Sequence, residues 1–246
     1  MRLDRFLAAA RATAKAADAL VEELAARGDV VVNVHTYGWP AYEAFHRRFH
    51  AEEPPDLVCL SMNPALHGAV QTGIPFTDAP MARDLLPGFD RLVQRPPALA
   101  TERVEMSGRK LRAWADQALG GLHVLHRRIL FVTACPVAVL RGPRLLNVPL
   151  PALRGRRRRA ADAFYQEHAL SLVRALAPKG LFLLGDYAGG RWIRIARVHP
   201  DVGRIPSTIT HHPAARISNE TKFHDWSLAL STLEREVTGT GPIPGS

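Results

Sequence analysis

The feature of this sequence that most restricts its fold is the alternation of short apolar runs with longer amphipathic segments. Each run has the length of a buried strand, and helical spacing or turn-forming glycine and proline separates it from the next. The strand-like runs cover residues 30–34, 57–60, 129–133, 180–185 and 205–210, and helical patterns cover 3–26, 41–49, 81–86, 111–119, 160–176, 188–197 and 223–237. Strands that alternate with helices form a mostly parallel sheet covered on both faces. The sequence therefore predicts an α/β fold with three layers, α/β/α.

The domain organisation follows from length and composition. With 246 residues the chain can form one large domain, which we expect to span residues 29–237. Residues 1–28 predict an amphipathic helix that ends at Gly28 and is either an appendage or part of the core. The Gly- and Pro-rich tail 238–246 predicts disorder. Residues 37–40 predict a turn, and the Pro- and Arg-punctuated residues 139–151 predict a loop.

The chain is strongly basic, with a net charge of +9 and a pI near 10.3. Only four of its 32 basic residues are lysine, and an arginine-rich surface suits phosphate recognition because the guanidinium fork binds two oxygens at once. Codon bias of a GC-rich genome would enrich arginine as well, so charge alone favours nucleic acid only modestly. The densest basic run, residues 154–159, is either a solvated helix start or a phosphate contact made by Arg154, Arg156 and Arg157.

Several cofactors and locations are disfavoured. The only cysteines, Cys59 and Cys135, lie in apolar stretches and predict buried thiols in a reducing cytoplasm. Two cysteines are too few for an iron–sulfur cluster ligated by cysteine alone. His46 and His50 could share a metal, but without a third ligand nearby a solvated helix face is the better interpretation. No secretory signal or bilayer-spanning run is evident, so we expect a cytoplasmic monomer that needs no metal or cofactor and contacts no membrane.

Polar side chains follow three of the predicted strands: Asn63, Thr133 and His212. In open α/β sheets, ligands bind at the carboxyl ends of the strands. We therefore expect these three residues to form one site. Each also has a plain structural alternative, such as an Asx turn for Asn63 before proline and a half-buried polar residue for His212.

Two stretches resemble the uracil-DNA glycosylase superfamily, and its single-strand-selective monofunctional branch in particular. The first matches that branch's motif at Met62, Asn63, Pro64, Gly68, Gln71, Thr72, Gly73, Pro75 and Phe76, and the second matches its His-Pro-Ser-Pro-Arg motif at His212, Pro213 and Arg216. The resemblance implies a monofunctional DNA glycosylase of the superfamily's fold. It also implies DNA, single- or double-stranded, as the partner.

The resemblance assigns roles to the matched residues. Asn63 positions the attacking water, and His212 donates to the pyrimidine O2, where negative charge develops. Phe76 stacks on the flipped base, while Met62 and Ala65 contact the substrate; Ala65 stands where the family has the glycine beside the pyrimidine C5. Gln71 and Arg216 are expected at the DNA, with Arg216 entering the space that the base has left. No lysine matches a catalytic position, which favours hydrolysis over Schiff-base chemistry.

Thr133 departs from the family, whose base-reading residue here is asparagine. A single hydroxyl can donate or accept, so it discriminates uracil from cytosine less well than an amide of fixed polarity. The substrate is then uracil, a 5-substituted uracil, or a bulky modified cytosine of phage DNA. Repair and defence both stay open. A further alternative is a protein that binds abasic or damaged DNA without cleaving it.

Overall fold

A computed structural model describes residues 2–239 of the chain, and its centre is a four-stranded parallel sheet in the order β3-β2-β6-β7. The strands are β2 (Leu57–Ser61), β3 (Ile129–Thr133), β6 (Gly180–Leu184) and β7 (Ser207–Thr210). Four of the five predicted runs form these strands, and β2, β3 and β6 are buried on both faces, whereas the edge strand β7 is partly exposed. The mostly parallel α/β prediction is confirmed.

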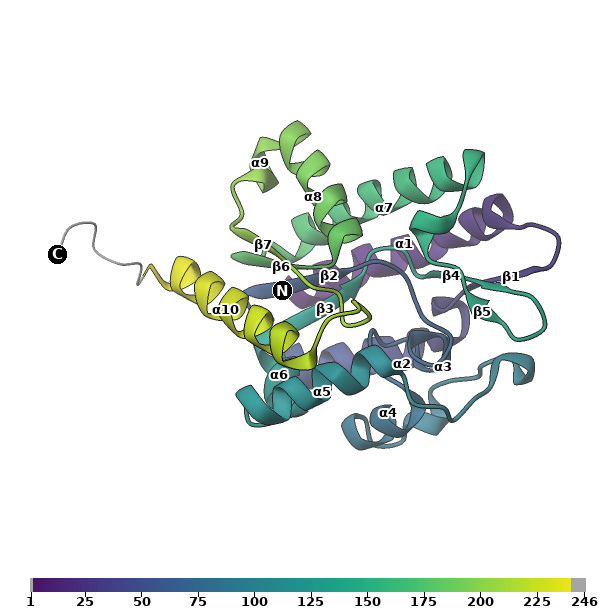
Figure 1. Ribbon diagram of the computed structural model, residues 1–246, viewed down its shortest axis with the longest axis horizontal. Coiled ribbons are helices and arrows are strands. Elements are labelled where there is room, and N and C mark those ends of the chain that lie inside the picture. Colours follow the sequence, from purple (N-terminus) through teal and green to yellow (C-terminus); the bar gives the residue numbers. More distant parts are fainter. Residues whose placement is uncertain (1, 240–246) are drawn as a thin grey trace.

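Alternate residues of the sheet strands enter two different cores. On β2, Val58 and Leu60 pack into one core, whereas Leu57 and Cys59 pack into the other. The first core is covered by α1 (Arg2–Leu24), α7 (Gly155–Leu176) and α8 (Asp186–Val198), and the second by α4 (Ala79–Leu85), α5 (Met106–Ala118), α6 (Leu122–Arg128) and α10 (Asn219–Thr238). Figure 1 shows these two helical layers above and below the sheet. Short helices α3 (Ala69–Thr72) and α9 (Pro200–Gly203) and three 3₁₀ turns, Phe89–Arg91, Pro97–Leu99 and Leu150–Ala152, complete the fold.

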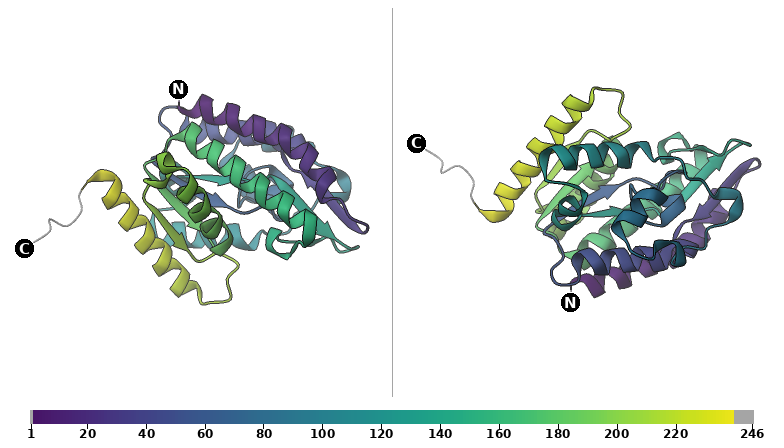
Figure 2. Two further views of the ribbon diagram at one scale, coloured as in Figure 1. Left: turned by 90° about the horizontal axis from the view of Figure 1, so that it is seen from above. Right: turned by 90° about the horizontal axis from the view of Figure 1, so that it is seen from below.

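The N-terminal helix α1 is part of the core. Its apolar face, which includes Phe6, Leu20 and Leu24, is buried and lies along α7. Both views in Figure 2 place α1 against the body of the molecule. Of the tail predicted to be disordered, residues 240–246 lie outside the described part of the chain.

The predicted loop at residues 139–151 is wrong. Strands β4 (Val137–Arg141) and β5 (Leu146–Asn147) form an antiparallel hairpin. Its strand β4 also pairs with β1 (Asp29–Asn33), which gives a second sheet in the order β1-β4-β5. Proline and arginine indicated a loop, but Val137–Leu140 are all fully buried and pair with a strand far away in the sequence. Such non-local pairing leaves little trace in local composition.

The predicted turn at residues 37–40 is also wrong, because α2 (His35–His50) runs through it with Pro40 inside the helix. Gly38 on α2 approaches Gly73 so closely that a Cβ on Gly38 would lie 2.7 Å from the Gly73 Cα. His46 and His50 do not lie on a solvated face: they are 0% and 1% exposed, among aromatic rings. Tertiary packing therefore overrides the local turn and surface signals.

Two features concern cofactors and membranes. Cys59 and Cys135 are buried free thiols, as predicted. Within residues 2–239 no three His, Cys, Asp or Glu side chains are grouped to hold a metal ion, and no helix there is long and apolar enough to span a membrane.

Candidate active site

A cavity of about 290 Å³ lies at the carboxyl edge of the parallel sheet. It brings together six predicted site residues, Met62, Asn63, Ala65, Phe76, Thr133 and His212, and it is also lined by Ser61, Glu105, Ser107, Asn147 and Ala214. The parallel order explains the meeting, because segments leaving β2, β3 and β7 emerge at the same edge. The size is at the small end of ligand pockets, which span roughly 300–1,000 Å³.

Asn63 carries an unused acceptor. Its Oδ1 is buried and has no hydrogen-bond partner among the described residues, while its Nδ2 donates to the Pro64 carbonyl at 3.3 Å. A buried carbonyl oxygen without a partner is costly unless a ligand or water completes it. Asn63 Oδ1 is therefore an acceptor at the cavity wall whose hydrogen bond the described residues do not supply.

His212 is held as a neutral donor. Its Nδ1 accepts from the Ala214 backbone N–H at 3.1 Å, so the ring proton of the neutral form lies on Nε2. Burial, assisted by the Lys110 cation, lowers the pKa of His212 to about 4. Gly185, with φ of +87°, leaves room for this residue, since a Cβ there would lie 2.9 Å from the His212 Cβ.

The loop that carries His212 is anchored by two lysines. Lys110 on α5 donates to the Pro213 carbonyl at 2.8 Å, and Lys222 on α10 donates to the Ile217 carbonyl at 2.6 Å. Together they fix both ends of the segment that presents His212 and Arg216. Neither lysine is among the described residues that line the cavity.

Gly68 and Gly108 pack closely against Glu105, and Gly108 also packs against Phe76. Glu105 caps α5 and accepts from the Gly108 N–H, and burial raises the pKa of its carboxyl. A Cβ on Gly68 would lie 2.6 Å from the Glu105 Cγ, and one on Gly108 would lie 2.0 Å from the Phe76 carbonyl oxygen. Only glycine fits these close approaches. They place Phe76, at φ of 56°, with its ring centroid 6.4 Å from that of His212.

Gln71 does not reach DNA, contrary to its assignment by resemblance. It is 0% exposed, and its amide donates to the carbonyls of Leu66 and Leu99 and accepts from the Thr101 N–H. Both amide protons and one lone pair of the amide oxygen are thus used within the protein. Gln71 ties the motif loop to residues 99–101.

The arginines of the basic run 154–159 differ in their surroundings, since some form ion pairs within the protein and others are exposed to solvent. Arg157 is partly buried and donates to Asp29 at 2.7 Å, and hydrogen bonds from Arg141 and Arg157 lower the pKa of Asp29 to about 2. Arg154 and Arg156 are exposed and make no ion pair among the described residues.

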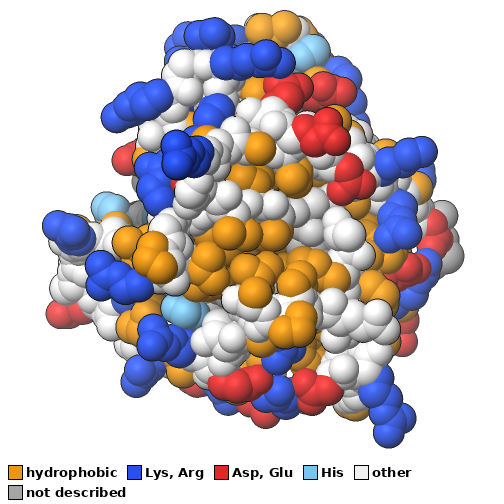
Figure 3. Space-filling view, turned by 90° about the vertical axis from the view of Figure 1, so that its right-hand side faces the viewer, with side chains coloured by type: hydrophobic (Ala, Val, Ile, Leu, Met, Phe, Trp, Pro, Cys, Tyr) orange, Lys and Arg blue, Asp and Glu red, His pale blue; other side chains and the backbone are white. Residues whose placement is uncertain are grey.

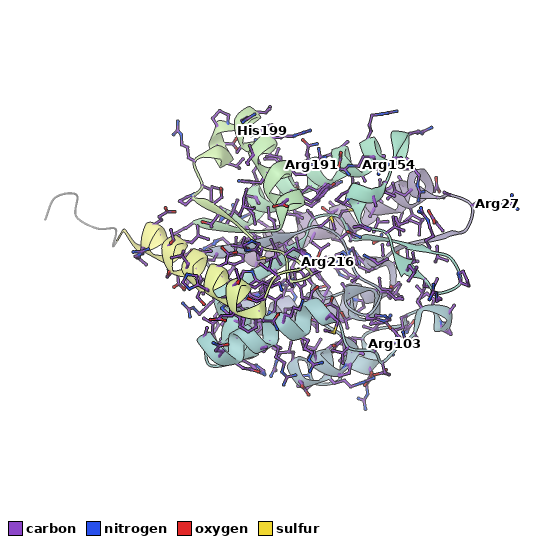
Figure 4. All side chains as sticks on the ribbon, viewed as in Figure 1. Arg27, Arg103, Arg154, Arg191, His199 and Arg216 are labelled. Carbon is purple, nitrogen blue, oxygen red and sulfur yellow. The ribbon has the colours of Figure 1, made fainter. Side chains whose placement is uncertain are left out.

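Arg216 is likewise exposed and unpaired within residues 2–239. Figure 4 places it on the loop between β7 and α10, with Arg103, Arg154 and Arg27 on the side of the molecule where the strands end. In this view these four labelled arginines lie apart and do not form one continuous cluster.

A larger groove of about 710 Å³ adjoins the cavity and was not predicted. Ala65, Glu105, Met106 and Asn147 line both, and the groove continues along residues 98–101 and the β4–β5 turn. Met106 and Leu146 are more than half exposed there. Figure 3, which faces the right-hand side of Figure 1, shows hydrophobic side chains at the centre of this face and Lys and Arg along much of its margin.

Ser61, Glu105 and Asn147 line the cavity and were not among the predicted site residues. Glu105 had a signal, because residues 105–108 read Glu-x-Ser-Gly, as in the family. Ser61 had none, since a serine at the end of a strand is common.

Fold and site together define an α/β protein with a cavity of about 290 Å³ at the sheet edge, lined by the Asn63 amide and the His212 imidazole. The model of the uracil DNA glycosylase superfamily matches residues 49–233, and the chain belongs to this superfamily.

Individual relatives come from the branch indicated by the motifs. The chain is 28% identical over 134 residues to the single-strand selective monofunctional uracil DNA glycosylase of Bos taurus, covering 50% of this chain and 48% of that protein. It is 28% identical over 167 residues to the corresponding enzyme of Rattus norvegicus, covering 63% and 55%. The matches thus span about half the length of these relatives. The crystal structure of Pedobacter heparinus SMUG2 has the same fold, with a TM-score of 0.64 and 17% identity over 89% of this chain and 98% of that one.

Proposed function

We propose that the protein is a monofunctional DNA glycosylase that hydrolyses the N-glycosidic bond of uracil and leaves an abasic site. The observation that carries the proposal is the pairing of an unpartnered Asn63 Oδ1 with a neutral His212 in one cavity. Membership of the superfamily and the names of the relatives support it. We further propose that it acts as a cytoplasmic monomer without a metal or cofactor.

The chemistry follows from the two polar groups. As the glycosidic bond breaks, the sugar gains oxocarbenium character, and Asn63 Oδ1 accepts from a water and holds it toward the anomeric carbon. The departing pyrimidine gains negative charge on O2, to which His212 Nε2–H donates. A donor aimed at developing charge contributes about 3 kcal/mol to the transition state. Asn63 is a weak base, so the water is deprotonated late.

The base must leave the stack to reach the cavity. Phe76, held by the Glu105–Gly108 cap, offers an aromatic face for it. Arg216 lies exposed beside His212 on the same loop, where it can enter the vacated space. Arg154 and Arg156 provide phosphate contacts further away. The absence of a lysine among the described lining residues favours hydrolysis over Schiff-base lyase chemistry.

The test is release of uracil from single-stranded and duplex oligonucleotides, followed by mass spectrometry of the base and by alkali cleavage of the strand. Uracil release with a single alkali-sensitive site supports the proposal. Tight binding to abasic DNA without any base release would favour the non-catalytic damage-binding alternative instead.

A second substrate class is favoured by one specific observation, the 710 Å³ groove that opens from the cavity past Ala65. By the family resemblance Ala65 lies beside the pyrimidine C5, so a substituent there would extend into the groove. His67, Arg103 and Arg144 line it and would favour hydroxyl-rich or anionic substituents. Assays on 5-hydroxymethyluracil and glucosylated-cytosine DNA test this class, and preference for the latter would indicate defence against phage.

A further inference from the structure

Ser61 and Thr133 form a hydrogen-bonded pair at the wall of the cavity. They lie opposite each other in the parallel register of β2 and β3, with 3.0 Å between the Ser61 Oγ and the Thr133 Oγ1. Ser61 Oγ also lies 3.1 Å from the Val132 carbonyl oxygen. Ser61 is 3% exposed, and both residues line the cavity.

The protons of this pair can be assigned by counting. A hydroxyl has one proton and two lone pairs, and a carbonyl oxygen only accepts. Two hydrogen bonds form only if Ser61 donates to Val132 and Thr133 donates to Ser61. The reverse arrangement, with Ser61 donating to Thr133, loses one of the two bonds. The Thr133 hydroxyl then has only lone pairs left for the cavity.

We propose that Ser61 is a positioning residue that fixes Thr133 as a hydrogen-bond acceptor, so that the cavity selects a pyrimidine bearing an N3–H, uracil, over one with an unprotonated N3, cytosine. This inference rests on the proposed function, because it specifies how the same cavity reads its base. The sequence alone suggested a hydroxyl free to donate or accept. The strand register removes that freedom.

The pair reproduces half of what the family's asparagine supplies. An amide accepts from N3–H and donates to O4, whereas the fixed Thr133 hydroxyl only accepts. Cytosine presents a lone pair at N3, which would face the lone pairs of Thr133 without a proton between them. A site built to pair with a substrate N–H rejects the analogue that lacks it. Within the second substrate class, the pair therefore favours a 5-substituted uracil over a modified cytosine.

The test compares binding of two oligonucleotides that resist hydrolysis, one with 2′-fluoro-deoxyuridine and one with 2′-fluoro-deoxycytidine. The 2′-fluorine destabilises the oxocarbenium-like transition state, so affinity is measured without turnover. We expect Ser61→Ala to reduce the uridine-to-cytidine affinity ratio about tenfold or more, because the Thr133 hydroxyl becomes free to donate. Thr133→Val, which keeps the β-branched shape, should reduce the ratio as well.

The double variant separates specificity from structure. Ser61→Ala should change the ratio no further in the Thr133→Val background, because its effect passes through the hydroxyl. Ser231→Ala is the matched control: it removes an exposed serine hydroxyl that donates to the Leu228 carbonyl at 2.9 Å, far along α10, and should leave the ratio unchanged. Thermal unfolding of each variant verifies folding.

Three outcomes would overturn the inference: an unchanged ratio in Ser61→Ala, an equal effect of Ser61→Ala with and without the Thr133 hydroxyl, or tighter binding of the cytidine oligonucleotide by the unmodified protein. Failure of the proposed function is a separate result. It would appear as no base release from unfluorinated DNA, whatever the binding ratio.

Discussion

Two groups of histidines in this molecule have the same electrostatic property, a lowered pKa, and different surroundings. One is His212 alone at the sheet edge, and the other is the α2–α6 cluster of His35, His46, His50 and His126. Burial lowers the pKa of His212 at the sheet edge to about 4 and that of His126 on α6 to about 3, and it lowers the pKa of His46 on α2 as well. His212 has one nitrogen fixed by a backbone N–H and lines a cavity. His46 has neither nitrogen hydrogen-bonded within residues 2–239 and packs against aromatic rings.

A low histidine pKa therefore reports burial, whereas catalysis also requires a ring proton that is oriented toward a cavity. Shifted pKa values are common at functional sites, but they also occur at buried structural positions. In the α2–α6 cluster, imidazoles act as flat rings that fill the second core beside Phe45 and Phe49. At the sheet edge, the same chemical group becomes a donor because Ala214 selects its tautomer.

The largest expected difference between the two groups is in turnover. His212→Ala should reduce kcat for uracil release about 10²–10³-fold, because it removes the donor to O2. Asn63→Ala should also reduce kcat strongly, and neither variant should weaken DNA binding or unfold the protein. His126→Leu should leave kcat per folded molecule unchanged. Single-turnover kinetics with gel-shift binding measure both, and loss of folding in place of kcat would assign Asn63 and His212 purely structural roles.

Acid stability should depend on the buried cluster. The pKa values of His35, His50 and His126 lie near 4, 4 and 3 in the folded protein, below the ordinary 6.5. Their stabilising contribution is complete above pH 6.5. It decreases as the pH falls toward 4, because the unfolded chain takes up protons that the folded one excludes. Each histidine makes the free energy of unfolding decrease by about 1.4 kcal/mol per pH unit in this window.

Urea denaturation at pH 8, 6 and 5 measures this slope. His126→Leu should flatten it by about 1.4 kcal/mol per pH unit. A free energy of unfolding that does not change between pH 8 and 5 would show that water reaches these imidazoles, and the cluster would then not share the low pKa of His212.

The sequence predicted the parallel sheet because its strand signals are local: each is a compact apolar run between turn residues. It missed the β1-β4-β5 sheet because Val137–Arg141 pair with a strand more than 100 residues earlier, beside prolines typical of loops. Pro40 suggested a turn, yet packing of α2 on Gly73 keeps the helix intact.

The site residues likewise include some that local sequence predicts and some that depend on the folded sheet. Asn63 and His212 were predicted because each lies in a motif that is contiguous in sequence. The structure places both at the cavity. Gln71 matched the same motif but points into the protein, and a match does not reveal the direction of a side chain. Ser61 acts through the β2–β3 register, which is a property of the folded sheet.

A smaller effect on turnover is expected from replacing Lys110, which contributes to the low pKa of His212. Lys110→Met removes the bond to the Pro213 carbonyl and the cation that helps to lower the pKa of His212. We expect kcat to decrease about tenfold, as for loss of one charged hydrogen bond that positions a catalytic loop. The pKa of His212, measured by NMR, should rise. Lys110→Arg should restore both, and an unchanged pKa of His212 would show that Lys110 acts only as an anchor.

The smallest expected effect is at His46, and its near absence is the informative result. His46→Leu replaces a fully buried ring that has no hydrogen bond within the described structure by an apolar side chain. Removing a polar group without partners is close to neutral or stabilising, so the free energy of unfolding at pH 8 should change by less than about 1 kcal/mol. Turnover should stay the same, because nothing from α2 lines the cavity. A large loss of turnover in a folded His46→Leu variant would mean that the cluster communicates with the sheet edge through α2 and Gly73, and the two groups of histidines would then be one system.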